Sequence, residues 1–333
     1  MRLAPAGGER QLVLVELPAA EALRPGEIRV RVHGASLNFR DGLVIGGVFP
    51  SLPGLIPLSD CAGEVVEVAA GVTQFARGDR VISTFHPNWR DGHVDRAELD
   101  NAPGGPAHGF ACEEAVRPAS HLTRAPGNLS LVEAACLPCA AVTAWRAVVT
   151  DGRVSPGQHV LVQGTGGVSL FALQFARAAG ATVIAIGSTP EKQERLRELG
   201  ADHVIDRIAT PDWGDAVLEL TGGLGAEHVI EVGGPNTLAQ SFKAARTGGH
   251  IAIIGAVAGF DVDTMPFAVV QAKRLCLQAV TVGSHRDQIE MVRAIEAHDI
   301  HPVIDRVFPL HALEDAVAHM RSGQQVGKIC IEI

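Results

Sequence analysis

Residues 159–178 read HVLVQGTGGVSLFALQFARA, and this stretch decides the fold of the second half of the chain. The apolar run at 159–163 predicts a short buried strand, and apolar residues then recur at helical spacing. The glycine turn between them lets the backbone approach a pyrophosphate, which the N–H groups of the helix N-terminus can bind. Ser169, at the third glycine position, is small enough for close helix packing. We therefore expect a dinucleotide to contact Gly164, Thr165, Gly166, Gly167 and Val168.

The same alternation continues after this stretch. Apolar runs at 182–186, 203–205, 227–232, 250–254 and 276–282 predict strands, and helix-like segments lie between them at 191–199, 212–220 and 236–246. Strands and helices at this spacing predict a doubly wound parallel sheet with helices on both faces, the Rossmann arrangement of an α/β protein.

The first 120 residues have a different texture. Residues 27–35 alternate between apolar and polar side chains, and 61–69 and 79–83 predict further short strands between glycine turns. Residues 86–109 form a long loop without periodicity. The change in sequence pattern and the chain length of 333 residues together predict two domains. Near the end of the chain we expect helices near 286–297 and 312–321 and a last strand at 329–333.

Composition narrows the class of protein. The chain carries 28 Lys and Arg against 37 Asp and Glu, a net charge of −9, which argues against nucleic acid or an anionic membrane as a main partner. We see no secretory segment and no membrane span, so a cytoplasmic protein with free thiols is expected. Tyr is absent, which removes one common proton donor from any mechanism.

The end of the second predicted strand bears on the choice of coenzyme. An acid at its tip would bind the ribose 2′-OH of NADH, but Gly187, Ser188 and Thr189 stand there instead. With the ammonium of Lys192, they fit the 2′-phosphate of NADPH better than they fit NADH. Arg207, just past the third strand, could stack on adenine, pair with the phosphate or simply be solvated.

Several segments together resemble the medium-chain dehydrogenase/reductase superfamily, and within it the zinc-free quinone oxidoreductase-like branch. The resemblance implies a GroES-like β-barrel catalytic domain at 1–122 and 284–333, a Rossmann domain at 123–283 and a cleft between them. It also implies a homodimer joined near 276–282. The matching segments, which cover nearly the whole chain, are 34–41 (GASLNFRD), 57–68 (PLSDCAGEVVEV), 71–81 (GVTQFARGDRV), 137–145 (LPCAAVTAW), 160–167 (VLVQGTGG), 198–206 (ELGADHVID), 231–234 (EVGG) and 327–331 (GKICI).

The resemblance also allows a test for catalytic zinc. Zinc alcohol dehydrogenases of this superfamily bind the metal with a Cys, a His-Glu pair and a later Cys. Those positions match Asn38, the pair Ser59 and Asp60, and Cys139. One soft ligand cannot hold a tetrahedral catalytic zinc, so we expect no metal.

Without a metal, the expected chemistry is hydride delivery from NADPH to a quinone or to an activated C=C bond of a small-molecule substrate. Asn38 matches the position where zinc-free relatives place an Asn near nicotinamide and substrate, so it is the predicted catalytic hydrogen-bond donor and a coenzyme contact. The resemblance implies further coenzyme contacts at Thr143, Val232, Gly233, Gly255, Ala256, Gly283 and Ser284.

Alternatives remain open at this point. The chain could be a zinc-type alcohol dehydrogenase that has lost its metal site, or an NADPH-binding protein without enzyme activity. Asn38 could merely cap a turn, and Lys328 could reach the cleft or be solvated. Cys136 and Cys139 form a CxxC motif, which is either redox-active or two packed thiols.

Overall fold

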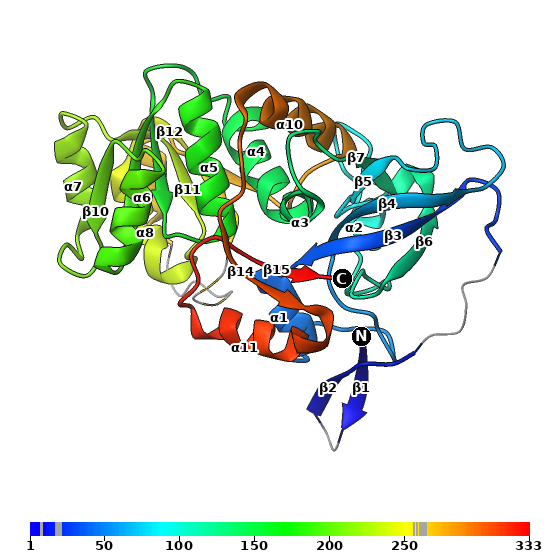
Figure 1. Cartoon of the computed structure of the whole chain (residues 1–333). Coiled ribbons are helices and arrows are strands. Elements are labelled where there is room, and N and C mark those ends of the chain that lie inside the picture. Colours follow the sequence, from blue (N-terminus) through cyan, green and yellow to red (C-terminus); the bar gives the residue numbers. More distant parts are fainter. Residues whose placement is uncertain (7–8, 17–21, 256, 258, 260–264) are drawn as a thin grey trace. The chain divides into compact units, whose positions relative to one another are not determined.

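The chain folds into two compact units, which we call unit 1 and unit 2. The computed structural model describes residues 1–6, 9–16, 22–255, 257, 259 and 265–333 (Figure 1). Unit 1 comprises Met1–Val142 and Val282–Ile333, and unit 2 comprises Thr143–Thr281. These limits differ from the expected boundaries at 122/123 and 283/284, mainly because residues 123–142 pack with unit 1. No described helix is long and apolar enough to cross a membrane.

Unit 2 is built on a six-stranded parallel sheet with the strand order β10-β9-β8-β11-β12-β13. This is the order of a doubly wound dinucleotide-binding sheet, so the expected Rossmann arrangement is confirmed. The strands are β8 (His159–Gln163), β9 (Thr182–Gly187), β10 (His203–Asp206), β11 (Ala226–Glu231), β12 (Ala245–Ile253) and β13 (Cys276–Ala279).

Helices cover this sheet because its central strands are apolar on both faces. All residues of β8 after His159 are buried, as in a strand with neighbours on either side. Helix α5 contacts β8 and β9, whereas α7 and α8 pack on each other over a core that includes Trp213 and Phe242. The helices are α4 (Val142–Trp145), the π-helical turn η3 (Arg146–Thr150), α5 (Gly167–Ala178), α6 (Pro190–Glu198), α7 (Trp213–Leu220), α8 (Pro235–Ala244) and α9 (Phe267–Ala272).

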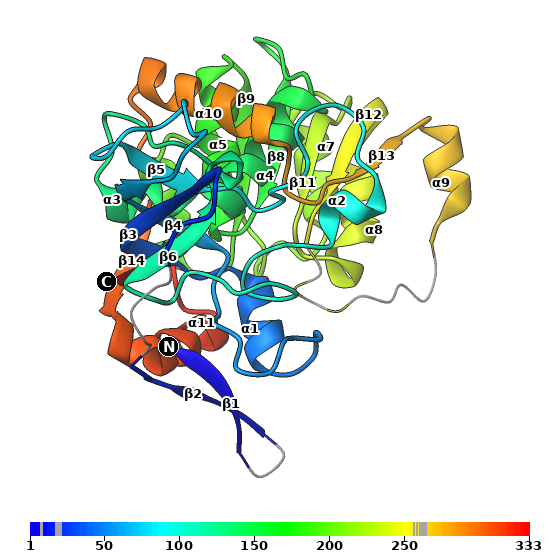
Figure 2. The same cartoon turned by 90° about the vertical axis from the view of Figure 1, so that its right-hand side faces the viewer.

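Unit 1 contains a seven-stranded, mainly antiparallel sheet. Its order is β14-β15-β3-β4-β5-β7, with β6 also paired to β3, while β1 and β2 form a separate ribbon (Figures 1 and 2). The alternation expected at 27–35 is confirmed, because Ile28, Val30 and Val32 of β3 are buried. The strands are β1 (Arg2–Ala6), β2 (Glu9–Val13), β3 (Glu27–Ser36), β4 (Asp60–Val68), β5 (Arg80–Ser83), β6 (Glu114–Pro118), β7 (Leu122–Arg124), β14 (Ile304–Pro309) and β15 (Lys328–Glu332).

The C-terminal strand completes this sheet. β15 pairs antiparallel with the end of β3, so that Cys330 lies opposite Ser36. This pairing brings the residues after β3 and the start of β15 together, although they are almost 300 positions apart. The helices of unit 1 are α1 (Phe39–Ile45), α2 (Arg96–Leu99), η1 (Ala119–His121), α3 (Leu131–Ala134), the π-helical turn η2 (Leu137–Ala141), α10 (His285–His298), η4 (Leu310–Ala312) and α11 (Leu313–Ser322).

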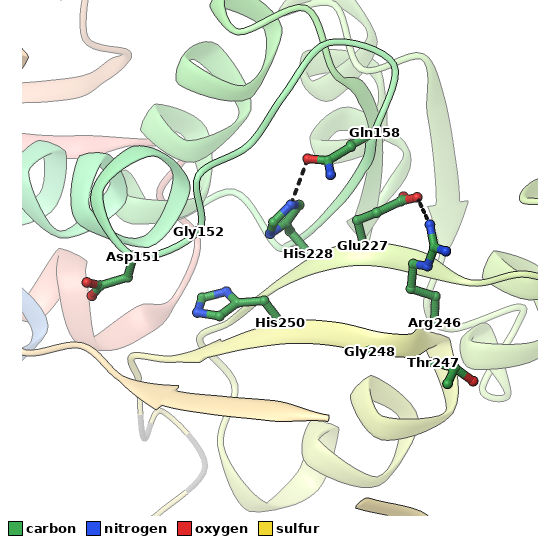
Figure 3. Close-up of a pocket in the computed structure, with 9 residues that line it drawn as sticks. All are labelled: Asp151, Gly152, Gln158, Glu227, His228, Arg246, Thr247, Gly248 and His250. Carbon is green, nitrogen blue, oxygen red and sulfur yellow. Dashed lines mark hydrogen bonds and ion pairs between the residues drawn. The ribbon is translucent and has the colours of Figure 1, made fainter. Parts of the chain in front are cut away.

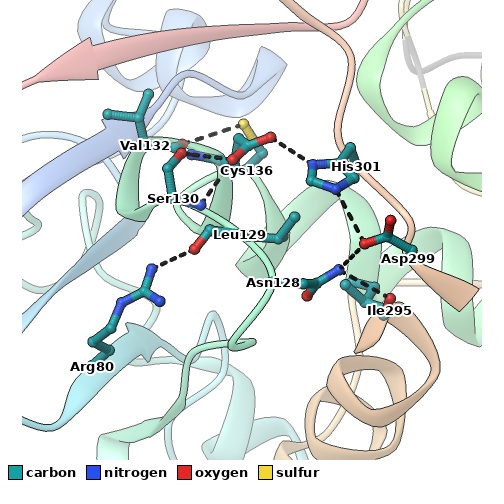
Figure 4. A network of polar contacts seen from close by, with 10 residues as sticks. Arg80, Asn128, Leu129, Ser130, Val132, Cys136, Ile295, Asp299 and His301 are labelled. Atoms are coloured by element: carbon teal, nitrogen blue, oxygen red, sulfur yellow. Dashed lines mark hydrogen bonds and ion pairs between the residues drawn. The ribbon is translucent and has the colours of Figure 1, made fainter. Parts of the chain in front are cut away.

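A polar network explains why residues 123–142 belong to unit 1 (Figure 4). The Glu133 carboxylate accepts from the backbone N–H and the hydroxyl of Ser130 with one oxygen, and its other oxygen lies 2.8 Å from Nδ1 of His301. The amide of Asn128 donates to the Asp299 carboxylate at 3.0 Å, and the guanidinium of Arg80 donates to the carbonyl of Leu129. These contacts join the segment to β5 and to the chain after α10.

One buried carboxylate organises the loop after β11 in unit 2. Glu231 Oε1 accepts from the backbone N–H groups of Gly233 and Gly234, at 2.8 and 2.9 Å, and from the Thr237 hydroxyl at 2.6 Å. Its Oε2 accepts from Nε2 of Gln163 at 2.9 Å and from the Ser241 hydroxyl. The side chain therefore ties β8, β11 and α8 together at the edge of the sheet where the glycine turn lies.

Replacing this carboxylate should leave several buried donors without an acceptor. We predict that Glu231→Ala lowers the free energy of unfolding by about 3 kcal/mol. The control Glu219→Ala removes an exposed acid of α7 and should change it by less than about 0.5 kcal/mol. Urea unfolding measures both values, and equal stability of the two variants would contradict the role given to Glu231.

Candidate active site

The glycine turn of unit 2 has the form expected for a pyrophosphate site. Gly164 follows β8 with a φ of +74°, which favours glycine, and its N–H donates to the carbonyl of Ile186. Gly166 caps the N-terminus of α5, a helix of 12 residues. Ser169 is buried, and its hydroxyl donates to the carbonyl of Gln163 at 2.6 Å, so it fastens the first turn of the helix to β8. The turn and the helix N-terminus together fit a bound anion.

The five residues expected at the 2′-phosphate lie at or near the end of β9. A Cβ on Gly187 would lie 2.7 Å from Cγ of Gln193, so close packing of α6 requires glycine here. Thr189 caps α6 by accepting from the backbone N–H of Lys192 at 3.3 Å. Arg207 is exposed, and its backbone N–H donates to the carbonyl of Gly187 at 2.9 Å. Ser188 lies between Gly187 and this cap.

An acid that the sequence interpretation missed lies beside this group. Asp206 ends β10 in register with Gly187 on the neighbouring strand. Its Oδ1 accepts from the backbone N–H groups of Ile208 and Ala209 at 2.8 and 3.1 Å. The neighbouring Gln193 side chain, followed by these N–H groups, lowers the pKa of Asp206. The only sign of it in the sequence was its place at the end of the segment 198–206.

The loops expected to contact the nicotinamide end at the same edge of the sheet. Val232 and Gly233 follow β11 and are held by Glu231. Gly255 follows β12, where a Cβ would lie 2.2 Å from the carbonyl oxygen of Val232, so only glycine permits this close approach. Thr143 is buried in α4 between the two π-helical turns. Ala256 lies outside the described residues.

In unit 1, Asn38 is part of a buried chain of hydrogen bonds. Its Nδ2 donates to the Ser59 hydroxyl at 3.3 Å, which in turn donates to Oδ1 of Asp60 at 2.7 Å. Oδ2 of Asp60 accepts from the backbone N–H of Cys139 at 3.0 Å. The ammonium of Lys328 donates to Oδ1 of Asn38 and to the carbonyl of Leu37, both at 2.6 Å. Lys328 is thus buried rather than solvated.

Asn38 also begins α1, where Asp41 holds its backbone. The Asp41 carboxylate accepts from the Asn38 N–H at 2.8 Å and lies 3.4 Å from the guanidinium of Arg40. Burial raises the pKa of Asp41 to about 6, nearby Asp60 raises it further, and Arg40 and Lys328 oppose the shift. Arg40 also donates to the carbonyl of Pro103 at 2.8 Å and thereby anchors the loop 86–109.

The residues at the zinc-ligand positions of the relatives do not fit a zinc ion. The ammonium of Lys328 already lies on the Asn38 oxygen and would repel a cation there. Burial raises the pKa of the Cys139 thiol far above its usual range, so it does not provide a ready thiolate. Within the described residues, no group of three or more His, Cys, Asp or Glu side chains could hold a metal ion.

Two expected coenzyme contacts have other partners in unit 1. The Ser284 hydroxyl caps α10 and lies 2.7 Å from Oδ2 of Asp287. A Cβ on Gly283 would lie 2.8 Å from Cγ1 of Val142. Neither position in unit 1 adds a donor to the buried chain at Asn38. Of the CxxC pair, Cys136 lies 3.3 Å from Cys330 between their sulfur atoms, and both thiols are reduced.

Unit 2 also has a polar cavity of about 380 Å³ (Figure 3). It lies near the starts of β8 and β11, whereas the glycine turn follows the end of β8. His228 Nε2 is 2.9 Å from Oε1 of Gln158, and the His228 and His250 rings are 5.9 Å apart. Burial, and then the neighbouring His250, lower the pKa of His228 to about 4, so this imidazole is neutral at pH 7. The lining residues are Asp151, Gly152, Gln158, Glu227, His228, Arg246, Thr247, Gly248 and His250.

Known proteins resemble this chain over its whole length. Residues 24–127 match the family described as alcohol dehydrogenase GroES-like domain, and residues 167–297 match that described as zinc-binding dehydrogenase. A zinc-type alcohol dehydrogenase-like protein of Schizosaccharomyces pombe is 42% identical over 98% of this chain and 96% of its own length. A 2-haloacrylate reductase of a Burkholderia species is 29% identical over 92% of this chain and 91% of its own length.

Solved structures agree with this result. An NAD-dependent alcohol dehydrogenase is 33% identical, with a TM-score of 0.88 and full coverage of both chains. The 2-octenoyl-CoA carboxylase reductase CinF, solved with NADP and 2-octenoyl-CoA, is 26% identical, with a TM-score of 0.85 over 97% of this chain and 82% of that one. Fold and matches together define an oxidoreductase with a GroES-like and a Rossmann domain. The chain belongs to the medium-chain dehydrogenase/reductase superfamily.

The raised pKa of Asp41 gives a testable dependence of stability on pH. A carboxyl whose pKa is higher in the folded than in the unfolded state stabilises the fold at low pH and loses that contribution as pH rises through about 6. We predict that Asp41→Asn gains up to about 3 kcal/mol relative to the unmodified protein between pH 4 and pH 7. Thermal unfolding midpoints of both proteins across this range measure the effect, and a constant difference would contradict it.

Proposed function

We propose that this protein is an NADPH-dependent, metal-independent reductase that delivers hydride to a quinone or to an activated C=C bond of enone or acryloyl type. The observation that carries the proposal is the chain of hydrogen bonds at Asn38, Ser59 and Asp60, which stands where zinc relatives have metal ligands. Reduction at an alkene carbon or at a quinone ring needs hydrogen-bond donors for the developing oxyanion and does not need a Lewis acid.

Asn38 is the proposed catalytic residue. Its amide oxygen is held by Lys328 and one of its N–H bonds by Ser59, so its second N–H is left to donate to a substrate oxygen. Asn38 is 8% exposed, and this burial keeps water from weakening that hydrogen bond. Because the chain has no Tyr, water is the proposed source of the proton that completes the reduction.

The coenzyme proposal rests on the residues at the end of β9. When bound, NADPH supplies a hydride from C4 of its nicotinamide. The turn at Gly164–Gly167 and the start of α5 would hold the pyrophosphate, and Ser188, Lys192 and Arg207 the 2′-phosphate. The carboxylate of Asp206 is already bound to backbone N–H groups, which reduces its effect on a phosphate nearby.

Names of relatives support the reductase proposal without deciding it. Two relatives are named after compounds with an activated C=C bond. They are a 2-haloacrylate reductase and a 2-octenoyl-CoA carboxylase reductase that was solved with NADP. Other relatives are named a zinc-type alcohol dehydrogenase-like protein and an NAD-dependent alcohol dehydrogenase. The misfit of zinc at Asn38, Ser59 and Cys139 favours the reductases.

A homodimer is proposed on the exposed side of unit 2. β13 is the edge strand of the sheet, and α9 precedes it (Figure 2). Met265, Phe267 and Val269, in and before α9, are exposed apolar residues, and Phe267 is 70% exposed. Within the described residues β13 ends the sheet, and a sheet edge beside an apolar surface favours pairing with a second copy. A small-molecule substrate and a cytoplasmic location complete the proposal.

The first test is turnover of NADPH with quinones, cyclic enones and acryloyl compounds. We predict that at least one class is reduced, and that Asn38→Ala and Asn38→Asp each lower kcat about 100-fold, because both remove the N–H donor. The matched control is Asn128→Ala, because the Asn128 amide binds Asp299 and is not part of the hydrogen bonds at Asn38. This variant should have an unchanged kcat. An Asn38→Asp enzyme of normal activity would contradict the assigned role.

The second test concerns the choice of coenzyme. Lys192→Ala should lower the preference for NADPH over NADH at least about 10-fold, because it removes a positive charge at the 2′-phosphate. Lys243→Ala, which removes a half-buried lysine paired with Asp215 in the same unit, should leave the preference unchanged. Fluorescence titrations with both coenzymes measure the ratio. An unchanged ratio in Lys192→Ala would show that Lys192 does not bind the phosphate.

A further inference from the structure

We propose that Lys328 is a positioning residue that aims and polarises the amide of Asn38, and that its ammonium supplies the positive charge that zinc relatives obtain from the metal. This inference rests on the proposed function, since it concerns the donor that acts on the substrate oxygen. Burial of this lysine is energetically costly, and its action on Asn38 would explain why the fold retains it.

The burial of Lys328 calls for an explanation. It is 3% exposed at the start of β15, and burying an ammonium is costly unless hydrogen bonds or nearby opposite charges compensate it. Its two recorded acceptors are neutral oxygens, on Leu37 and Asn38. Among the described residues, Nζ of Lys328 forms no ion pair with a carboxylate. The charge is therefore directed at an amide rather than neutralised by an adjacent acid.

The contact fixes which way the Asn38 amide points. An ammonium can only donate, so it must lie on Oδ1 and not on Nδ2. Nδ2 therefore points toward Ser59. The Ser59 hydroxyl accepts a hydrogen bond from Nδ2 at 3.3 Å and donates one to Asp60. A rotated amide would place two donors against each other at Lys328. Lys328 thus selects the orientation in which Asn38 offers an N–H to a ligand.

The same contact strengthens that N–H as a donor. A positive charge 2.6 Å from Oδ1 draws electrons from the amide nitrogen and makes its hydrogens more acidic. The effect is largest in a buried site, where water does not screen the charge. The carboxylates of Asp41 and Asp60 balance the overall charge without touching the ammonium, because they bind Asn38 N–H, Ser59 and Cys139 N–H instead.

Gly327 allows the lysine to enter the buried chain. It has a φ of +89°, and a Cβ there would lie 2.1 Å from the carbonyl oxygen of Val303. Only glycine fits this position, which turns the chain into β15 directly before Lys328. Gly327 and Lys328 therefore act together: the glycine makes the turn, and the turn allows the lysine to reach Asn38.

The first experiment measures kinetics of the full chain with the best acceptor found. Lys328→Met and Lys328→Gln should lower kcat at least about 10-fold with KM for NADPH nearly unchanged, and Lys328→Arg should regain most of the loss. The double variant Asn38→Ala with Lys328→Met should be no slower than Asn38→Ala alone, because the lysine acts through that amide. Additive losses, or a loss confined to KM for NADPH, would overturn the proposal.

The second experiment does not need turnover. The chain has five asparagines, Asn38, Asn88, Asn101, Asn128 and Asn236, so ¹⁵N-asparagine labelling gives five side-chain amide signals in NMR. The signal missing in Asn38→Ala identifies Asn38. It should shift strongly in Lys328→Gln and stay in place in Lys273→Met, a matched control whose ammonium binds the backbone carbonyls of Phe242, Lys243 and Ala245.

The two experiments separate the inference from the proposed function. An unmoved Asn38 signal in Lys328→Gln overturns the contact whether or not the enzyme reduces any acceptor. A shifted signal with no turnover of any quinone or enone by the unmodified protein supports the contact and overturns the reductase. Far-UV circular dichroism of each variant confirms that it is folded, and Lys328→Gln and Lys328→Arg replace Lys328→Met if that variant does not fold.

Discussion

The contact between the Lys328 ammonium and the Asn38 amide is the interaction on which the proposed chemistry depends. It requires the antiparallel pairing of β15 with β3, the glycine turn at Gly327 and the helix start at Asn38. Burying an ammonium in this way is costly, and the side chains of Asn38, Ser59 and Asp60 beside it are joined by hydrogen bonds. Unit 2 also has a buried charged group, the carboxylate of Glu231, which accepts hydrogen bonds from several surrounding donors.

These two buried charges also show what the sequence could not reveal. The strand at 159–163, the glycine turn and the strand-helix alternation were predicted correctly, because local periodicity and turn residues determine them. Lys328 and Glu231 depend on partners far away in the chain, and no local pattern distinguishes a buried lysine from a solvated one. The elements α1, β6, β7 and β14 were not predicted, because their sequences lack a clear period.

The superfamily contains both alcohol dehydrogenases and reductases, so the fold leaves the reaction open. The side chains at a few positions distinguish the two chemistries. Here an amide, a hydroxyl and a protonated thiol occupy three of the positions at which a metal would need anionic or imidazole ligands, and the carboxylate at the fourth accepts hydrogen bonds from Ser59 and from the Cys139 N–H. A covalently attached ammonium offers a positive charge in the same region that no chelator can remove. It also cannot bind an alkoxide with the strength of a metal, which favours substrates whose oxyanion is already delocalised.

Metal content measured together with turnover tests this account most directly. The purified protein is analysed for zinc and other transition metals, and its NADPH-dependent rate on an enone or quinone is measured before and after dialysis against a strong chelator. The account predicts far less than one metal ion per chain and an unchanged rate. One zinc per chain, with a rate that disappears on its removal and returns when zinc is added, would contradict it.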